Sequence, residues 1–121
     1  MNFTVLGALV GACSVVLGAF GAHALRGQLE PAMQAVFETA VRYQFLHALA
    51  LLFVGWAADE RRRPGAALAG WLFVAGIVLF SGSLYALVFT RLTGWGAVTP
   101  LGGVAFIAGW LALARASWTR A

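Results

Sequence analysis

Four apolar segments, separated by short polar connections, make up most of this chain. A helix of about 17 to 25 apolar residues crosses the hydrocarbon core of a bilayer, which is ~30 Å thick. The pattern therefore predicts an all-α integral membrane protein, a bundle of four transmembrane helices in a single domain covering residues 1–121. We place the spans at about residues 3–22, 40–58, 66–90 and 98–114.

An amphipathic segment precedes the second span. Pro31 suits the first position of a helix, and Glu30 before it suits the positive end of the helix dipole. Apolar residues then recur at i, i+3 and i+4 spacing. Because a helix over residues 31–58 would be about 42 Å long at ~1.5 Å per residue, we expect its first turns to form an interfacial extension.

Composition supports a membrane protein and excludes several other classes. Hydrophobic residues make up 62% of the chain and charged residues 10%, against about 25% charged in soluble domains. The net charge of +4 comes from arginines spread over the span ends, which argues against a nucleic-acid partner because such proteins cluster their basic residues. The first segment lacks the basic start of a signal peptide, so we expect it to remain as a membrane helix. The lone Cys13 provides no disulfide framework.

The arginines also predict an orientation. Five of them fall on the side of the two termini and three on the other side, and short basic loops mark the cytoplasm. Both termini are therefore expected in the cytoplasm. The first group is Arg61, Arg62, Arg63, Arg115 and Arg120, and the second is Arg26, Arg42 and Arg91.

Small residues recur at helical spacing within the spans. Helices in lipid associate through close packing, which small residues allow, so we interpret these positions as helix contacts, with a glycine-lined permeation path as the alternative. They are Gly7, Gly11, Ser14, Gly18 and Gly21 in the first span, Gly76 in the third, and Gly102 and Gly109 in the fourth.

Polar side chains at membrane depth gather toward the non-cytoplasmic leaflet. Such groups are costly inside a span, and each is a candidate for function. The candidate ligand-binding residues are His23, Arg42, Tyr43, Gln44, His47, Ser81, Ser83, Tyr85 and Thr99. Arg42 points away from His47 on the helix and lies over Glu38, so we expect an interfacial ion pair between Arg42 and Glu38, with an anion or lipid headgroup as the alternative partner of Arg42.

His47 has three interpretations. It is a neutral imidazole bonded to Ser81, Ser83 or Tyr85, or it helps Gln44 and Tyr85 to hold a quinone or lipid. As a third alternative, His23 and His47 at similar depth ligate a metal or a haem, although no carboxylate or cysteine stands at ligand spacing. We therefore predict no cofactor.

Several chemistries lack their motifs in this sequence. It contains no recognisable nucleophile motif, no phosphate-binding glycine loop and no H-E-x-x-H pattern. No acidic residue stands in the middle of a span, which argues against a proton-coupled antiporter. We therefore expect a protein that is not an enzyme.

Four blocks of the sequence resemble one family. They are GAFGAHAL (18–25), VRYQFLHAL (41–49), LFSGSLY (79–85) and TPLGG (99–103). They are similar to the family called domain of unknown function 423, small bacterial inner-membrane proteins similar to the eukaryotic transmembrane protein 256. The resemblance implies a four-span protein of the inner membrane and no established activity. Its blocks contain the polar residues selected above, which favours a shared site.

The preferred hypothesis is a non-enzymatic membrane protein whose polar residues bind a lipid-like or small polar ligand, or a membrane protein partner. A small transporter or channel, acting as a homo-oligomer, is the alternative. A metal or haem protein with His23 and His47 as ligands is the third hypothesis.

Overall fold

The computed structural model describes residues 2–60 and 63–118, and every regular element in these ranges is helical. The elements are α1 (Phe3–His23), α2 (Pro31–Glu60), α3 (Pro64–Gly76), the π-helical segment η1 (Ile77–Ser81), α4 (Gly82–Thr90), the 3₁₀ segment η2 (Thr93–Ala97) and α5 (Thr99–Trp118). Because η1 continues directly into α4, the third predicted span is one continuous helical rod. Four helices are long and apolar enough to cross a membrane, as the sequence predicted.

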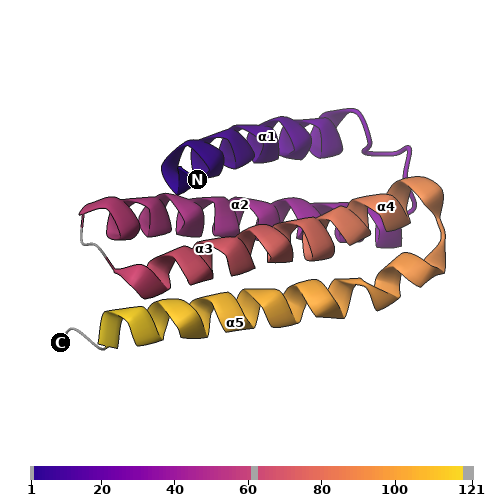
Figure 1. Ribbon diagram of the computed structural model, residues 1–121. Coiled ribbons are helices and arrows are strands. Elements are labelled where there is room, and N and C mark those ends of the chain that lie inside the picture. Colours follow the sequence, from indigo (N-terminus) through magenta and orange to yellow (C-terminus); the bar gives the residue numbers. More distant parts are fainter. Residues whose placement is uncertain (1, 61–62, 119–121) are drawn as a thin grey trace.

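The helices run antiparallel, and both termini lie at one end of the molecule (Figure 1). The connections over residues 24–30 and 91–98 lie at the opposite end, which we call the connection end. α1 packs chiefly on α2, and α5 packs chiefly on α3 and η1. α1 is therefore an outer helix of the bundle, with most of its surface turned away from the other helices.

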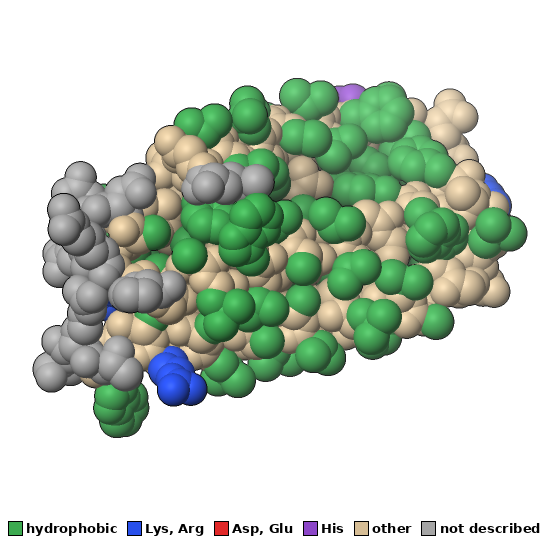
Figure 2. Space-filling view, in the orientation of Figure 1, with side chains coloured by type: hydrophobic (Ala, Val, Ile, Leu, Met, Phe, Trp, Pro, Cys, Tyr) green, Lys and Arg blue, Asp and Glu red, His purple; other side chains and the backbone are tan. Residues whose placement is uncertain are grey.

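Apolar side chains cover the flanks of the molecule, and arginines appear near its ends (Figure 2). Leu9 of α1 and Ile107 of α5 are 64% and 62% exposed. A water-soluble protein seldom exposes apolar patches of this extent, whereas lipid is a suitable solvent for them. The surface agrees with the membrane protein predicted from the sequence.

Local chemistry accounts for the helix ends. The side chain of Asn2 accepts a hydrogen bond from the backbone N–H of Val5 at 3.2 Å and caps α1. α3 begins at a proline, which suits the first turn of a helix because its missing N–H would have no partner there. α4 ends at Thr90, and the residue that follows it, Arg91, has a left-handed φ of 58° that stops the helix.

Glycines allow the helices to approach closely. A Cβ built at Gly7 would lie 2.8 Å from the carbonyl oxygen of Ala48 on α2. The other predicted small residues of α1 also face α2, with Gly11 and Gly18 in looser contact than Gly7 and Gly21. Gly76, Gly102 and Gly109 lie where the third and fourth spans meet, against aromatic residues of the facing helix.

Candidate functional site

The polar residues at membrane depth form separate links between helices. Gln44 is 5% exposed, and its Oε1 accepts a hydrogen bond from the Tyr85 hydroxyl at 2.7 Å. Its Nε2 donates to the backbone carbonyl of Val10 at 3.4 Å. One side chain on α2 therefore links α1 and α4 to its own helix.

Replacing Tyr85 with phenylalanine is expected to destabilise the protein by about 1–2 kcal/mol, because the buried Oε1 of Gln44 loses its donor. Unfolding of the purified protein in mixed micelles measures this change. Tyr43→Phe is the matched control, since Tyr43 is 38% exposed and no described group bonds to its hydroxyl. An equal loss in the two variants would contradict the role of the Tyr85 bond.

His47 is bonded at both ring nitrogens. Its Nδ1 lies 2.8 Å from the backbone carbonyl oxygen of Tyr43, and its Nε2 lies 3.1 Å from the indole Nε1 of Trp110 on α5. A carbonyl only accepts and an indole N–H only donates, so the proton sits on Nδ1 and the imidazole is neutral. The ring also stacks on Phe106 with centroids 3.6 Å apart.

The neutral imidazole agrees with the first interpretation of His47, but its predicted partners were wrong. Trp110 takes the place of Ser81, Ser83 or Tyr85. An indole N–H within an apolar membrane span needs an acceptor, and His47 Nε2 supplies it for Trp110.

Both ring nitrogens of His47 are thus engaged within the protein, and its one free lone pair, on Nε2, accepts from Trp110, so ligation of a metal or haem through Nε2 would require breaking the Trp110 bond. His23 is exposed at the end of α1, just beyond Gly21, which packs on Phe37. His47 lies ten residues farther along α2, roughly 15 Å. The similar depth expected for the two histidines was therefore wrong.

The serines and Thr99 make two further links. Ser81 is fully buried, and its hydroxyl donates to the carbonyl of Ala40 at 2.7 Å, which joins η1 to α2. The hydroxyls of Ser83 and Thr99 lie 2.6 Å apart and join α4 to α5. These contacts engage the hydroxyls of Ser81, Ser83 and Thr99 and help to fix the relative positions of the helices.

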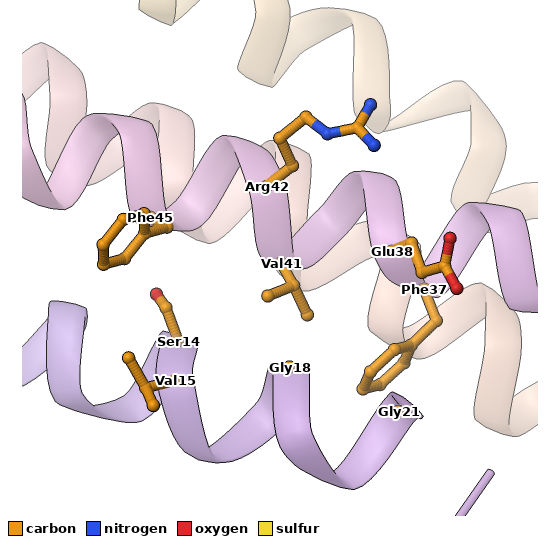
Figure 3. A pocket seen from close by; sticks show the side chains of 9 residues that line it. All are labelled: Ser14, Val15, Gly18, Gly21, Phe37, Glu38, Val41, Arg42 and Phe45. Atoms are coloured by element: carbon orange, nitrogen blue, oxygen red, sulfur yellow. The ribbon is translucent and has the colours of Figure 1, made fainter. Parts of the chain in front are cut away.

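A groove of about 320 Å³ lies between α1 and α2. Its floor is apolar or small, with Gly18 and Gly21 on α1 opposite Phe37, Val41 and Phe45 on α2. Figure 3 shows these three α2 side chains directed toward α1. Ser14 and Val15 extend the groove away from the connection end.

Two opposite charges, Glu38 and Arg42, stand at the edge of the groove, which we call its rim. The ion pair expected between them is not formed; Glu38 Oε1 instead accepts a hydrogen bond from Gln34 Nε2 at 3.2 Å. The same Nε2 donates to the carbonyl of Gly21 at 2.9 Å and so holds Gln34 in place. The guanidinium of Arg42 extends away from α1 (Figure 3), and among the described residues it has no ion-pair partner.

Comparison with known proteins shows the family. The family model "Protein of unknown function (DUF423)" matches residues 17–103. The chain belongs to this family. It is similar to the UPF0382 membrane protein YwdK of Bacillus subtilis (strain 168), 48% identical over 95% of this chain and 94% of the relative. It is also 48% identical to the UPF0382 membrane protein SH2409 of Staphylococcus haemolyticus over 92% of this chain and 90% of the relative. No solved structure matches.

The family, identified as DUF423 by the resemblance, is thus confirmed, and its relatives are named as membrane proteins. The family description carries no activity, so the function of this DUF423 protein has to be argued from its own geometry. Among the described residues, no group of three His, Cys, Asp or Glu side chains could hold a metal ion.

Sequence reasoning selected only some of the groove residues. It chose Arg42 as a ligand candidate and the α1 residues Ser14, Gly18 and Gly21 as packing positions, but it missed the α2 side chains opposite them. A glycine in the sequence shows that a neighbouring helix can approach closely, but not that it does so. At Gly18 the nearest atom to a built Cβ, Val41 Cγ1, is 3.5 Å away, which is an ordinary contact and looser than at Gly7 or Gly21, and Gly18 lines the groove.

Proposed function

We propose that this protein is a non-enzymatic protein of the bacterial inner membrane that binds a lipid-like amphiphile in the groove between α1 and α2. The observation that carries the proposal is the combination of an apolar floor with a charged rim. Ligand sites are commonly concave and mostly apolar, with a few polar groups that set the orientation of the ligand. An amphiphile has this same division between chain and headgroup.

The depth of the groove supports a lipid. Counting from Ala58, where the apolar part of α2 ends, twenty residues at ~1.5 Å each place Glu38 about 30 Å away, at the opposite edge of the bilayer core. The rim then lies at headgroup level. From Gly21 to Ser14 the floor runs inward for about 10 Å, which suits an acyl chain.

The hydrogen bonds of the other candidates also favour the groove. Gln44, His47 and Tyr85 each make a hydrogen bond to a neighbouring helix, so a ligand bound by them would have to replace existing bonds. Arg42 is the member of the predicted set that lines the groove, and its guanidinium is not engaged in an ion pair with a described residue.

We also propose that both termini face the cytoplasm, which places the rim of the groove in the non-cytoplasmic leaflet. The start of α1, the end of α2 and the end of α5 share one end of the molecule. The arginine counts at the two ends support this orientation.

Gly18→Leu tests the proposal. The new side chain would occupy the groove, since a Cβ at this position meets only ordinary contact with Val41. We expect wild-type protein released from lipid nanodiscs to carry a bound lipid in native mass spectrometry, and the variant to lose at least about 90% of it, equal to ~1.4 kcal/mol or more.

Ala19→Leu is the matched control. Ala19 is exposed, does not line the groove and receives the same side chain one residue along α1. Retention of lipid in the control together with its loss in Gly18→Leu supports the groove. Equal lipid in all three proteins, or none in the wild type, would overturn the proposal.

A further inference from the structure

We infer that the preferred occupant of the groove is a phospholipid whose headgroup carries both a phosphate and a primary ammonium, with the phosphate bound by Arg42 and the ammonium by Glu38. The inference rests on the proposed function and adds the chemical class of the headgroup. It is carried by the two opposite charges on one rim that do not bind each other.

Glu38 and Arg42 are four residues apart on α2, a spacing at which opposite charges can pair. In the structure these two charges do not pair; Glu38 Oε1 accepts a hydrogen bond from the Gln34 amide, which also donates to the carbonyl of Gly21. The carboxylate and the guanidinium are both exposed and are presented separately. Two unpaired opposite charges at the edge of a bilayer are best satisfied by a ligand that brings both complementary charges.

The rim disfavours other headgroups. A purely anionic headgroup would pair with Arg42 but would lie close to the Glu38 carboxylate, which it repels. An uncharged headgroup would leave both charges without an ionic partner. A zwitterion neutralises both, and a guanidinium is well suited to phosphate because it can donate two parallel hydrogen bonds.

The carboxylate also distinguishes a primary from a quaternary ammonium. Glu38 has acceptor oxygens, and a primary ammonium donates hydrogen bonds to such oxygens whereas a trimethylated one has no N–H. Phosphatidylethanolamine has the required headgroup. Phosphatidylcholine lacks the donors, and phosphatidylglycerol lacks the cation.

The experiment uses the full chain in nanodiscs that contain these three phospholipids in equal amounts and with identical acyl chains. Native mass spectrometry identifies the bound lipid by its mass. We expect phosphatidylethanolamine to exceed each of the other two by about fivefold, the effect of a partly exposed charge interaction of ~1 kcal/mol. In Glu38→Gln the total bound lipid should persist while this preference disappears.

Glu30→Gln is the control, because it removes the same charge from an exposed residue outside the groove. It should keep the wild-type preference. Lipid binding that Gly18→Leu abolishes but that shows no headgroup preference would overturn this inference and leave the proposed function standing. A preference that survives in Glu38→Gln would also overturn it. A third outcome is a dimer without bound lipid that Gly18→Leu dissociates. It would overturn both the proposed function and the headgroup inference, and it would assign the groove to a second copy of the chain.

Discussion

Gly102→Ala is expected to destabilise the protein by about 2–3 kcal/mol, the upper range for overpacking a well-packed contact. A Cβ at Gly102 would overlap the backbone nitrogen of Phe80 in η1, and it would lie 2.7 Å from the Phe80 Cα. Since these are backbone atoms, no change of rotamer can relieve the overlap. Either α5 must move away from η1 or the π-helical turn must change. Unfolding in mixed micelles measures the loss.

Gly103→Ala is the control for this prediction. A Cβ at Gly103 meets no atom within 4 Å, so the variant gains helix propensity without a clash. We expect it to be neutral or more stable by up to about 1 kcal/mol. Two adjacent glycines in the same turn of α5 should thus respond with opposite signs. A similar loss in both would mean that the contact with Phe80 is not what requires Gly102.

The four helices could be predicted because hydropathy and length determine them. An apolar segment of membrane length has few alternatives to a helix, since every backbone group must bond within the segment. The polar turn before Pro31 and the turn at Arg91 likewise give local signals of helix ends. The π-helical turn at Ile77–Ser81 carries no Pro or other local signal in the sequence; in the structure it lies against Gly102 and bonds to Ala40 through Ser81, contacts that only the tertiary structure shows.

The hydrogen-bond partners were less predictable than the residues that form them. Depth selected Gln44 and His47 as candidates for function, and both are buried. Depth could not show that α5 presents Trp110 to His47, since that depends on the rotation of a helix distant in sequence. An indole N–H in the middle of an apolar span was the available signal, because such a donor needs an acceptor.

The groove was harder to predict for the same reason. A stripe of small residues indicates close approach of a neighbouring helix, and on α1 the helix α2 does approach closely at Gly7 and Gly21. Between them, at Gly18, α2 stands farther off and leaves space. The same sequence pattern thus includes tight contacts at Gly7 and Gly21 and a looser one at Gly18 beside the groove, and only the tertiary structure distinguishes them.

His47→Ala is expected to destabilise the protein by about 3 kcal/mol. The variant removes a ring that is 4% exposed and stacked on Phe106, and it leaves the indole N–H of Trp110 without an acceptor. Leu46→Ala is the control, because Leu46 is the preceding residue and is 49% exposed on the outer surface. It should lose less than about 1 kcal/mol in the same unfolding measurement, since it makes no core cavity.

The bond between His47 and Trp110 can be separated from the loss of the ring by a double-mutant cycle. Trp110→Phe keeps an aromatic ring beside Phe73 and removes the N–H, so Nε2 of His47 loses its donor. We expect this variant to lose about 1–2 kcal/mol, and the double variant with His47→Ala to lose less than the sum by about 1 kcal/mol. Strict additivity would contradict the bond. In the wild type, nitrogen NMR of labelled histidine should show a proton on Nδ1 of His47, because the indole can only donate to Nε2; a proton on Nε2 would contradict it independently of stability.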